Sequence, residues 1–337
     1  MQGSSAPSGT AAAVSLSVGP AAAQMRAAAT AFLAALTAEQ HAVTRGELDD
    51  PGYRDWTYKP GPRPGLAVED MSGQQRDLAF ALLATALSPD GLASARSIMA
   101  LEPVLRDLEK LKGDPKWPLR GEGRYWFRVL GQPTAGAAWA WRVNGHHLAI
   151  HVALAGDQVS VTPQFFGANP ATHLEGGTTV RTLLAEDQLG FQLLGQLTPA
   201  ELATAVTSHS APWDLATRHD PLLDSRRVPT GLRYRDMAEP ARALLVKLVE
   251  YYLGRSLPPF AGAAWRAVVD AGLDDVSFGW AGSLTHDAPH YYSVLGPTFL
   301  LEYATTNASP NHVHTIWRDA QHDWGDDILA THYAREH

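Results

Sequence analysis

The stretch that decides the fold is residues 137–170, "AAWAWRVNGHHLAIHVALAGDQVSVTPQFFGANP". β-Branched and aromatic residues dominate it, as they do in strands that pack against a core. The tripeptide "AGD" at 155–157 is typical of a hairpin turn between two strands. We therefore predict part of a sheet here, with its first strand already at "RYWFRVLG" (124–131).

A second block with strand character covers residues 274–318. It contains "DDVSFGWAG" (274–282), "HYYSVLGPTFLLEYATT" (290–306) and "HVHTIWR" (312–318). Helical patterns precede the first block and separate the two blocks, without a regular alternation of strand and helix. This order predicts an α+β fold. Its sheet should be mainly antiparallel and should join the two blocks, about 124–170 and 274–318, across the intervening helices.

The helical patterns lie in the N-terminal and middle segments, with a short final helix near 325–334. We predict helices over 25–36, 72–87 and 92–113, and a second helical stretch over about 180–270. In that stretch "TPAE" (198–201) is typical of a capping box. Residues 1–24 are small and polar and predict a flexible tail, so that 25–337 would form a single domain. The proline-rich segment 51–66 should lie extended over the surface.

Composition narrows the classes of function. Of the 337 residues 45% are hydrophobic and 18% charged, which indicates a globular chain. The net charge is −8, and lysine and arginine do not cluster in the sequence. We therefore expect a small-molecule substrate rather than nucleic acid or a membrane surface. Without cysteine there can be no thiolate metal site and no cysteine nucleophile. We expect a cytoplasmic location; because "AAAQ" near the start is similar to a cleavage site, an exported form with a removed or degraded leader is the alternative.

Histidines are the strongest chemical signal. Motifs for a nucleophile elbow, a Walker A loop and a dinucleotide fold are missing, whereas six histidines fall in the strands expected within the two blocks. Alternation in a strand places His312 and His314 on one face. A hairpin between their strand and the preceding one would bring Glu302 to both histidines. Such a set leaves coordination positions open on a first-row metal, as catalysis requires.

The predicted roles follow from side-chain chemistry. A metal ion would accept nitrogen ligands, a carboxylate would take a proton from bound water, and an arginine would neutralise charge on the substrate. We expect zinc first and copper or iron next, with no organic cofactor. The expected metal ligands are His147, His290, His312 and His314. The expected catalytic residues are Glu302, Asp319 and Arg318. The expected substrate-binding residues are Trp141, His146, Asn169, Tyr292 and Trp317.

Three functions remain open at this point. The first is a metal-dependent hydrolase acting on a small polar or carbohydrate-like substrate. The second is a copper or iron oxidoreductase that uses the same histidines. The third is a non-catalytic binding protein in which histidines and tryptophans form a ligand cleft, and each histidine could also be a structural residue of the core.

Several long motifs in this order resemble a bacterial family known as domain of unknown function 3500. They are "WRVNGHHLAIH", "VTPQFFGANP", "FGWAG", "PHYYSVLGPTFLLEY" and "NHVHTIWRD", with "RPGL" and "IMALE" upstream. The resemblance covers the chain from about Met25 onward and implies a family without an established activity. It also implies that the following residues correspond to family motif positions: Gly145–His147, Gly167–Pro170, His290, Glu302, Tyr303, His312, His314 and Asp319. His151 stands where the family often has asparagine, so the resemblance does not support it as a ligand.

Overall fold

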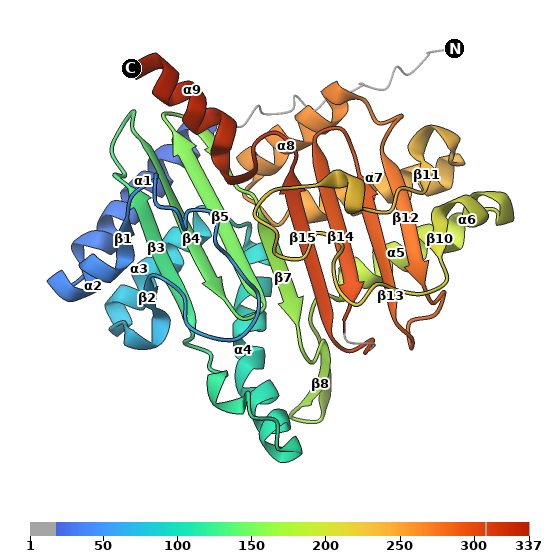
Figure 1. Ribbon diagram of the computed structural model, residues 1–337, viewed down its shortest axis with the longest axis horizontal. Coiled ribbons are helices and arrows are strands. Elements are labelled where there is room, and N and C mark those ends of the chain that lie inside the picture. Colours follow the sequence, from blue (N-terminus) through green and yellow to red (C-terminus); the bar gives the residue numbers. More distant parts are fainter. Residues whose placement is uncertain (1–17, 307–308, 337) are drawn as a thin grey trace, which may run out of the picture.

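One wide sheet organises the molecule. The computed structural model describes residues 18–306 and 309–336, and within these residues thirteen strands join into one mixed sheet (Figure 1). The main path runs β1-β3-β4-β5-β7-β15-β14-β13-β12-β10, while β2, β6 and β11 add to its flanks and β8 and β9 form a separate hairpin. Most pairs are antiparallel, and β1 with β3 and β10 with β12 are parallel. The predicted α+β class is confirmed, with a sheet that is mixed rather than purely antiparallel.

The strands have the following bounds: β1 (Arg45–Gly46), β2 (Leu66–Ala67), β3 (Tyr125–Gly131), β4 (Ala138–Gly145), β5 (Leu148–Ala155), β6 (Gln158–Ser160), β7 (Gln164–Ala168), β8 (Thr172–Glu175), β9 (Thr178–Arg181), β10 (Val206–Ser208), β11 (Leu232–Arg233), β12 (Ser277–Gly282), β13 (His290–Leu295), β14 (Phe299–Thr305) and β15 (Val313–Asp319). The helices are α1 (Val18–Ala34), α2 (Ala38–Thr44), α3 (Gly73–Ala84), α4 (Pro89–Lys112), α5 (Leu184–Gln196), α6 (Pro199–Ala205), α7 (Glu239–Leu253), α8 (Pro258–Ala271) and α9 (Asp326–Glu336).

The two strand blocks meet where β7 pairs with β15. This antiparallel contact sets His314 opposite Gly167 and Thr315 opposite Phe166, although the two strands are far apart in the sequence. We call this contact the seam. It joins the blocks across the helices that separate them along the chain, as the sequence predicts. The β4–β5 hairpin ends beside it, because β5 also pairs with β7.

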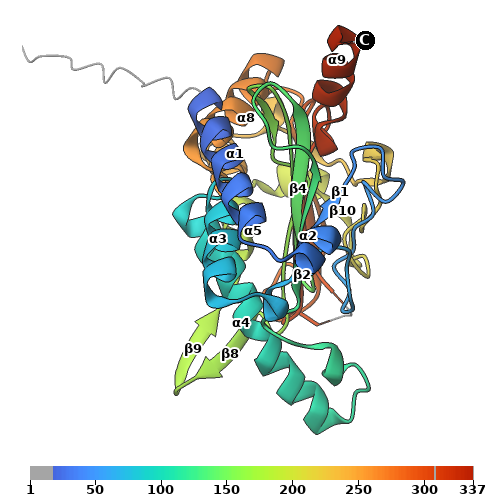
Figure 2. The same cartoon turned by 90° about the vertical axis from the view of Figure 1, so that its left-hand side faces the viewer.

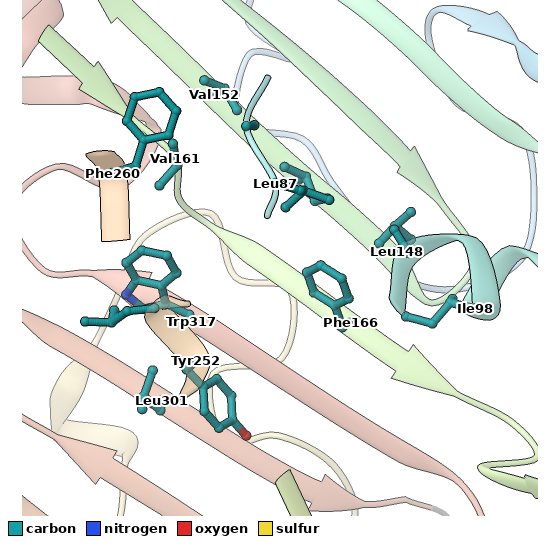
Figure 3. Packing of buried hydrophobic residues seen from close by; sticks show 14 of the residues in the cluster. Leu87, Ile98, Leu148, Val152, Val161, Phe166, Tyr252, Phe260, Leu301 and Trp317 are labelled. Carbon is teal, nitrogen blue, oxygen red and sulfur yellow. The ribbon is translucent and has the colours of Figure 1, made fainter. Parts of the chain in front are cut away.

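Helices cover one face of the sheet, which we call the helix face. Seen nearly edge-on, α1, α3 and α8 lie on this side (Figure 2). The core beneath them is built from large side chains that alternate along the strands, such as Trp139, Trp141 and Val143 on β4. Figure 3 shows Leu148, Phe166 and Trp317 within this core.

Irregular segments and α9 cover the opposite face, which we call the loop face. The proline-rich segment after α2 crosses it and buries Tyr53, Trp56 and Tyr58 against Phe165 and several alanines of the sheet. The segment was predicted to lie extended over the surface, but it is irregular and covers a second core. Because both faces are buried, β5 is buried at every position, which explains the continuous apolar runs in the sequence.

Three predicted element bounds were wrong. Helix α1 begins at Val18, within the expected tail, because its alanine-rich first turns favour helix and bury Ala21 and Ala22; residues 1–17 of that tail lie outside the described residues. The single strand expected over 290–306 is a hairpin, since the chain reverses between Leu295 and Phe299. Residues 209–231 contain no α-helix and instead cross the loop face.

The helices α3, α4, α6, α7 and α9 lie near their predicted positions, and the capping box of α6 is present with Thr198 and Glu201. Helix α8 begins earlier than expected, at Pro258. Of the residues that the structure describes, no helix combines the length and apolarity needed to cross a membrane.

Candidate metal centre

The β4–β5 turn supplies the first histidine of the candidate centre. The ladder closes at Gly145 opposite Leu148, which leaves His146 and His147 as a two-residue turn. His147 adopts a φ of 63°, a conformation that is uncommon outside glycine and often marks functional sites. Gly145 is needed because a Cβ there would lie 2.4 Å from a ring atom of Tyr125. The turn thus presents two adjacent imidazoles at the seam.

The start of β15 supplies the other two histidines. Both were predicted on the strand over 312–318, but β15 begins at Val313, so His314 lies in the strand and His312 just before it. Opposite them, Gly167 leaves the space that the rings occupy. A Cβ on Gly167 would lie 2.9 Å from Cδ2 of His314 and 3.0 Å from Cδ2 of His147.

The three imidazoles converge. One nitrogen from each of His147, His312 and His314 lies within 4.8 Å of the others, and Nε2 of His147 is 3.0 Å from Nε2 of His312. Nε2 of His314 is buried and has no hydrogen-bond partner among the residues that the structure describes. Burial lowers the pKa of His147 well below its ordinary value, and burial together with His314 lowers the pKa of His312 to about 3. Both rings are therefore neutral at pH 7, which is the form that binds metal.

Asp214 and Tyr58 hold the His314 ring in place. Nδ1 of His314 lies 2.7 Å from Oδ1 of Asp214, and the Tyr58 hydroxyl donates to Oδ2 of the same carboxylate at 2.7 Å. Burial raises the pKa of Asp214, but hydrogen bonds from His314 and Tyr58 outweigh this and hold it below its ordinary value. In the tautomer whose Nδ1 proton is donated to this carboxylate, Nε2 carries the lone pair that a metal needs. Carboxylate–histidine pairs of this kind orient metal ligands in proteins.

A cavity of about 550 Å³ opens onto the cluster. His146 and Asn169, two of the predicted substrate-binding residues, line it together with the three converging histidines. Its other walls carry charged and aromatic side chains. These are Tyr58, Lys59, Glu109, Asp114, Lys116, Arg120, Trp213 and Asp214.

Glu302 lies on the same face of the sheet as His314 but does not join the cluster. The β14–β15 register pairs Ala304 with His314. Glu302 belongs to the next pair on the same face, opposite Ile316. Its buried carboxylate accepts hydrogen bonds from the backbone of Ala216 and Thr217 and from the Tyr291 hydroxyl. Glu302 thereby fixes the loop that carries Asp214, and the structure does not bring it to the three histidines.

The predicted catalytic pair Arg318 and Asp319 lies at the other end of β15. Asp319 is five residues from His314, or about 16 Å along a strand. Arg318 is buried, bonds Oδ2 of Asp323 at 2.6 Å and donates to the Asp220 carbonyl. Asp319 accepts hydrogen bonds from the backbone of the following turn. Both residues shape that turn and are separate from the cluster.

The remaining predicted residues belong to the helix face. His290 lies on this face, because its neighbour Tyr291 shares the loop face with His314. Nε2 of His290 is 2.8 Å from Oδ1 of Asp187. Trp141, Tyr292 and Trp317 are buried in the helix-side core, so none of the three lines the cavity.

Sequence reasoning missed four residues of this region: Tyr58, Asp214, Glu102 and Arg120. All four belong to segments outside the predicted strand blocks, and only the fold brings them to the seam. The motif "PWDL" at 212–215 carried a usable signal, because a proline and an aspartate within the expected helical stretch are typical of a turn.

The fold and site together define an α+β protein with one wide mixed sheet and a buried histidine cluster at the seam of its two strand blocks. Residues 19–326 match the model of the family described as "Protein of unknown function (DUF3500)", and the chain belongs to this family. Nothing among curated proteins or solved structures matches the chain.

Proposed function

We propose that this protein is a metal-dependent hydrolase whose cation binds His147, His312 and His314. The observation that carries the proposal is the convergence of three imidazole nitrogens from buried His147 and His314 and half-buried His312, of which Nε2 of His314 has no hydrogen-bond partner among the described residues. A buried nitrogen without a partner is costly, and a cation would satisfy it. Three histidines leave one position open on tetrahedral zinc, which is the arrangement of catalytic sites.

The cation would supply Lewis acidity and lower the pKa of a bound water to near 7. Asp214 would hold His314 in the tautomer that offers Nε2, and Tyr58 would hold Asp214. With water activated in this way, no separate base of the kind expected from Glu302 or Asp319 is needed.

The substrate would be small and polar. The cavity of about 550 Å³ is lined by the exposed Trp213, whose ring could stack on a ring of the substrate. Arg120 and Lys116 line the same cavity and would neutralise negative charge that develops on the substrate, the role expected earlier of Arg318.

Copper chemistry is the second candidate, because a ligand set made only of imidazoles suits copper as well as zinc. The same residues would then support an oxidation. The identity of the bound element separates the two functions.

The first test is the metal content of untagged protein, measured by inductively coupled plasma mass spectrometry. The double variant His312→Ala/His314→Ala should lose the metal and keep its circular dichroism spectrum. His151→Asn is a matched control, because His151 is a buried histidine of the same sheet whose Nε2 bonds Tyr53 instead. Equal metal content in wild type and double variant would refute the site.

The second test is activity. Wild-type protein with its metal, metal-free protein and the double variant are compared on chromogenic carboxylic, phosphate and glycosidic esters. The proposal predicts turnover of at least one class by the metal-bound wild type alone. Equal turnover by the metal-free protein would contradict a metal-dependent hydrolase.

A further inference from the structure

A second group of potential ligands lies beside the first. It consists of Glu102 from α4 and of His146 and His147 from the β4–β5 turn, and one ligand atom from each lies within 4.8 Å of the others. All three residues are at most 7% exposed. A carboxylate on a covering helix is thus brought to the same turn that supplies the first centre.

The carboxylate of Glu102 is incompletely bonded. Its Oε1 lies 2.5 Å from Nδ1 of His146, while its Oε2 is buried and makes no well-formed hydrogen bond to the described residues, and only the backbone N–H of Gly121 approaches the carboxylate. An unpaired carboxylate oxygen in a buried position is unfavourable unless a cation or a donor meets it. Glu109, on the same helix and lining the same cavity, differs because both its oxygens bond Arg120.

We propose that a second divalent cation binds Glu102, His146 and His147 next to the first centre. The inference rests on the proposed function, because it extends the same centre by one ion. His147 belongs to both groups, so its ring would bridge the two cations as an imidazolate, with one nitrogen on each cation and the N–H proton released to solvent. Nε2 faces His312 and serves the first group, which leaves Nδ1 for the second.

The donor set indicates the class of cation. One carboxylate and two imidazoles suit zinc, manganese or iron(II), whereas magnesium and calcium prefer oxygen ligands throughout. The second site should therefore take a transition metal and discriminate against calcium.

The test is a titration of chelator-treated, full-length protein with zinc chloride, followed by isothermal titration calorimetry and by metal analysis after gel filtration. We expect two zinc ions per wild-type chain. Glu102→Gln should bind one, and His312→Ala should also bind one, because each variant loses a different site. Glu109→Gln, the matched control, should still bind two.

Each failure has its own signature. One zinc ion in both wild type and Glu102→Gln, lost in His312→Ala, would overturn the second site and leave the proposed function intact. One zinc ion that Glu102→Gln loses and His312→Ala keeps would refute the first centre instead. No zinc in the wild type would refute both. If Glu102→Gln does not fold by circular dichroism, His146→Ala takes its place with the same expected loss of one ion.

Discussion

Each face of the sheet carries a hydrogen-bonded unit of one histidine, one aspartate and one tyrosine, and the two units differ in the partners of the histidine. On the loop face His314 bonds Asp214, which accepts a hydrogen bond from Tyr58. On the helix face His290 bonds Asp187, which accepts a hydrogen bond from Tyr303. Each unit combines a histidine, an aspartate and a tyrosine, and sequence patterns cannot tell the two apart.

The second ring nitrogen distinguishes them. Nδ1 of His290 bonds the carbonyl oxygen of Ala288 at 2.9 Å, and its ring stacks between Trp280 and Tyr303. Nε2 of His314 has no hydrogen-bond partner in the described part of the chain and belongs to the group formed with His147 and His312. The helix-face unit is closed and structural, whereas the loop-face unit is open and can accept a ligand. Convergence matters as well, because Nδ1 of buried His151 also lacks a partner among the described residues but belongs to no group of potential ligands there.

The largest expected effect comes from exchanging each histidine for alanine. His314→Ala should lose the bound metal completely, because it removes one of three ligands. His290→Ala should keep the metal but lower the free energy of unfolding by about 2 kcal/mol or more, since it removes buried hydrogen bonds and ring contacts. Metal analysis and urea unfolding measure the two effects. Loss of metal in His290→Ala with an intact fold would contradict the conclusion that His314, and not His290, is a metal ligand.

The aspartates give the next largest effect. Asp214→Asn introduces a carboxamide, whose N–H can donate to Nδ1 of His314. This favours the tautomer protonated at Nε2, which cannot bind metal, so metal affinity should fall by roughly 10- to 100-fold. Asp187→Asn makes the same change in the closed unit and should leave the affinity unchanged. Competition with a chromogenic chelator measures both. Equal affinities in the two variants would show that Asp214 does not orient a ligand.

Gly167→Ala should affect the loop-face histidines by steric contact alone. The added methyl group would press on the rings of His314 and His147. We expect metal affinity to fall by roughly tenfold, the lower end of the range seen when residues that contact metal ligands are changed. Gly73→Ala is the control, because a Cβ there meets nothing within 4 Å. An unchanged affinity in Gly167→Ala, measured by the same competition, would mean that the rings can move apart without loss.

The smallest effect is a dependence of stability on pH in metal-free protein. The pKa of His312 is lowered to about 3, so the folded state binds this proton more weakly than the unfolded chain does. The contribution to stability is therefore complete above about pH 6.5 and is lost as pH falls, by about 1.4 kcal/mol per pH unit for this one group. Urea unfolding at pH 7, 6 and 5 should show a shallower slope in His312→Gln. Identical slopes would contradict a neutral, buried His312.

Much of the fold could be predicted because strand and helix patterns are local. The joining of the two strand blocks followed from their composition and order, but the pairing of β7 with β15 that joins them was not predicted. The hairpin at Gly296 was missed because a glycine–proline pair was treated as an irregularity within one strand. The loop at 209–231 was missed because isolated helical signals on either side suggested a continuous helical stretch.

The candidate site was only partly predictable. His147, His312 and His314 were named from the sequence, and the structure brings these three together, whereas it places His290 on the other face. Strand alternation correctly separates neighbours but does not say which face holds the site. Asp214 and Glu102 could not be found in this way, because they reach the cluster from a loop and a helix by tertiary packing.

The most direct measurement is an anomalous difference map from crystals grown with zinc, collected above and below the zinc absorption edge. The account predicts a peak within about 2.1 Å of a nitrogen of each of His147, His312 and His314. It predicts none at His290. A map without density between the three histidines, or with its main peak on the helix face, would contradict the central claim that the open unit is the metal site.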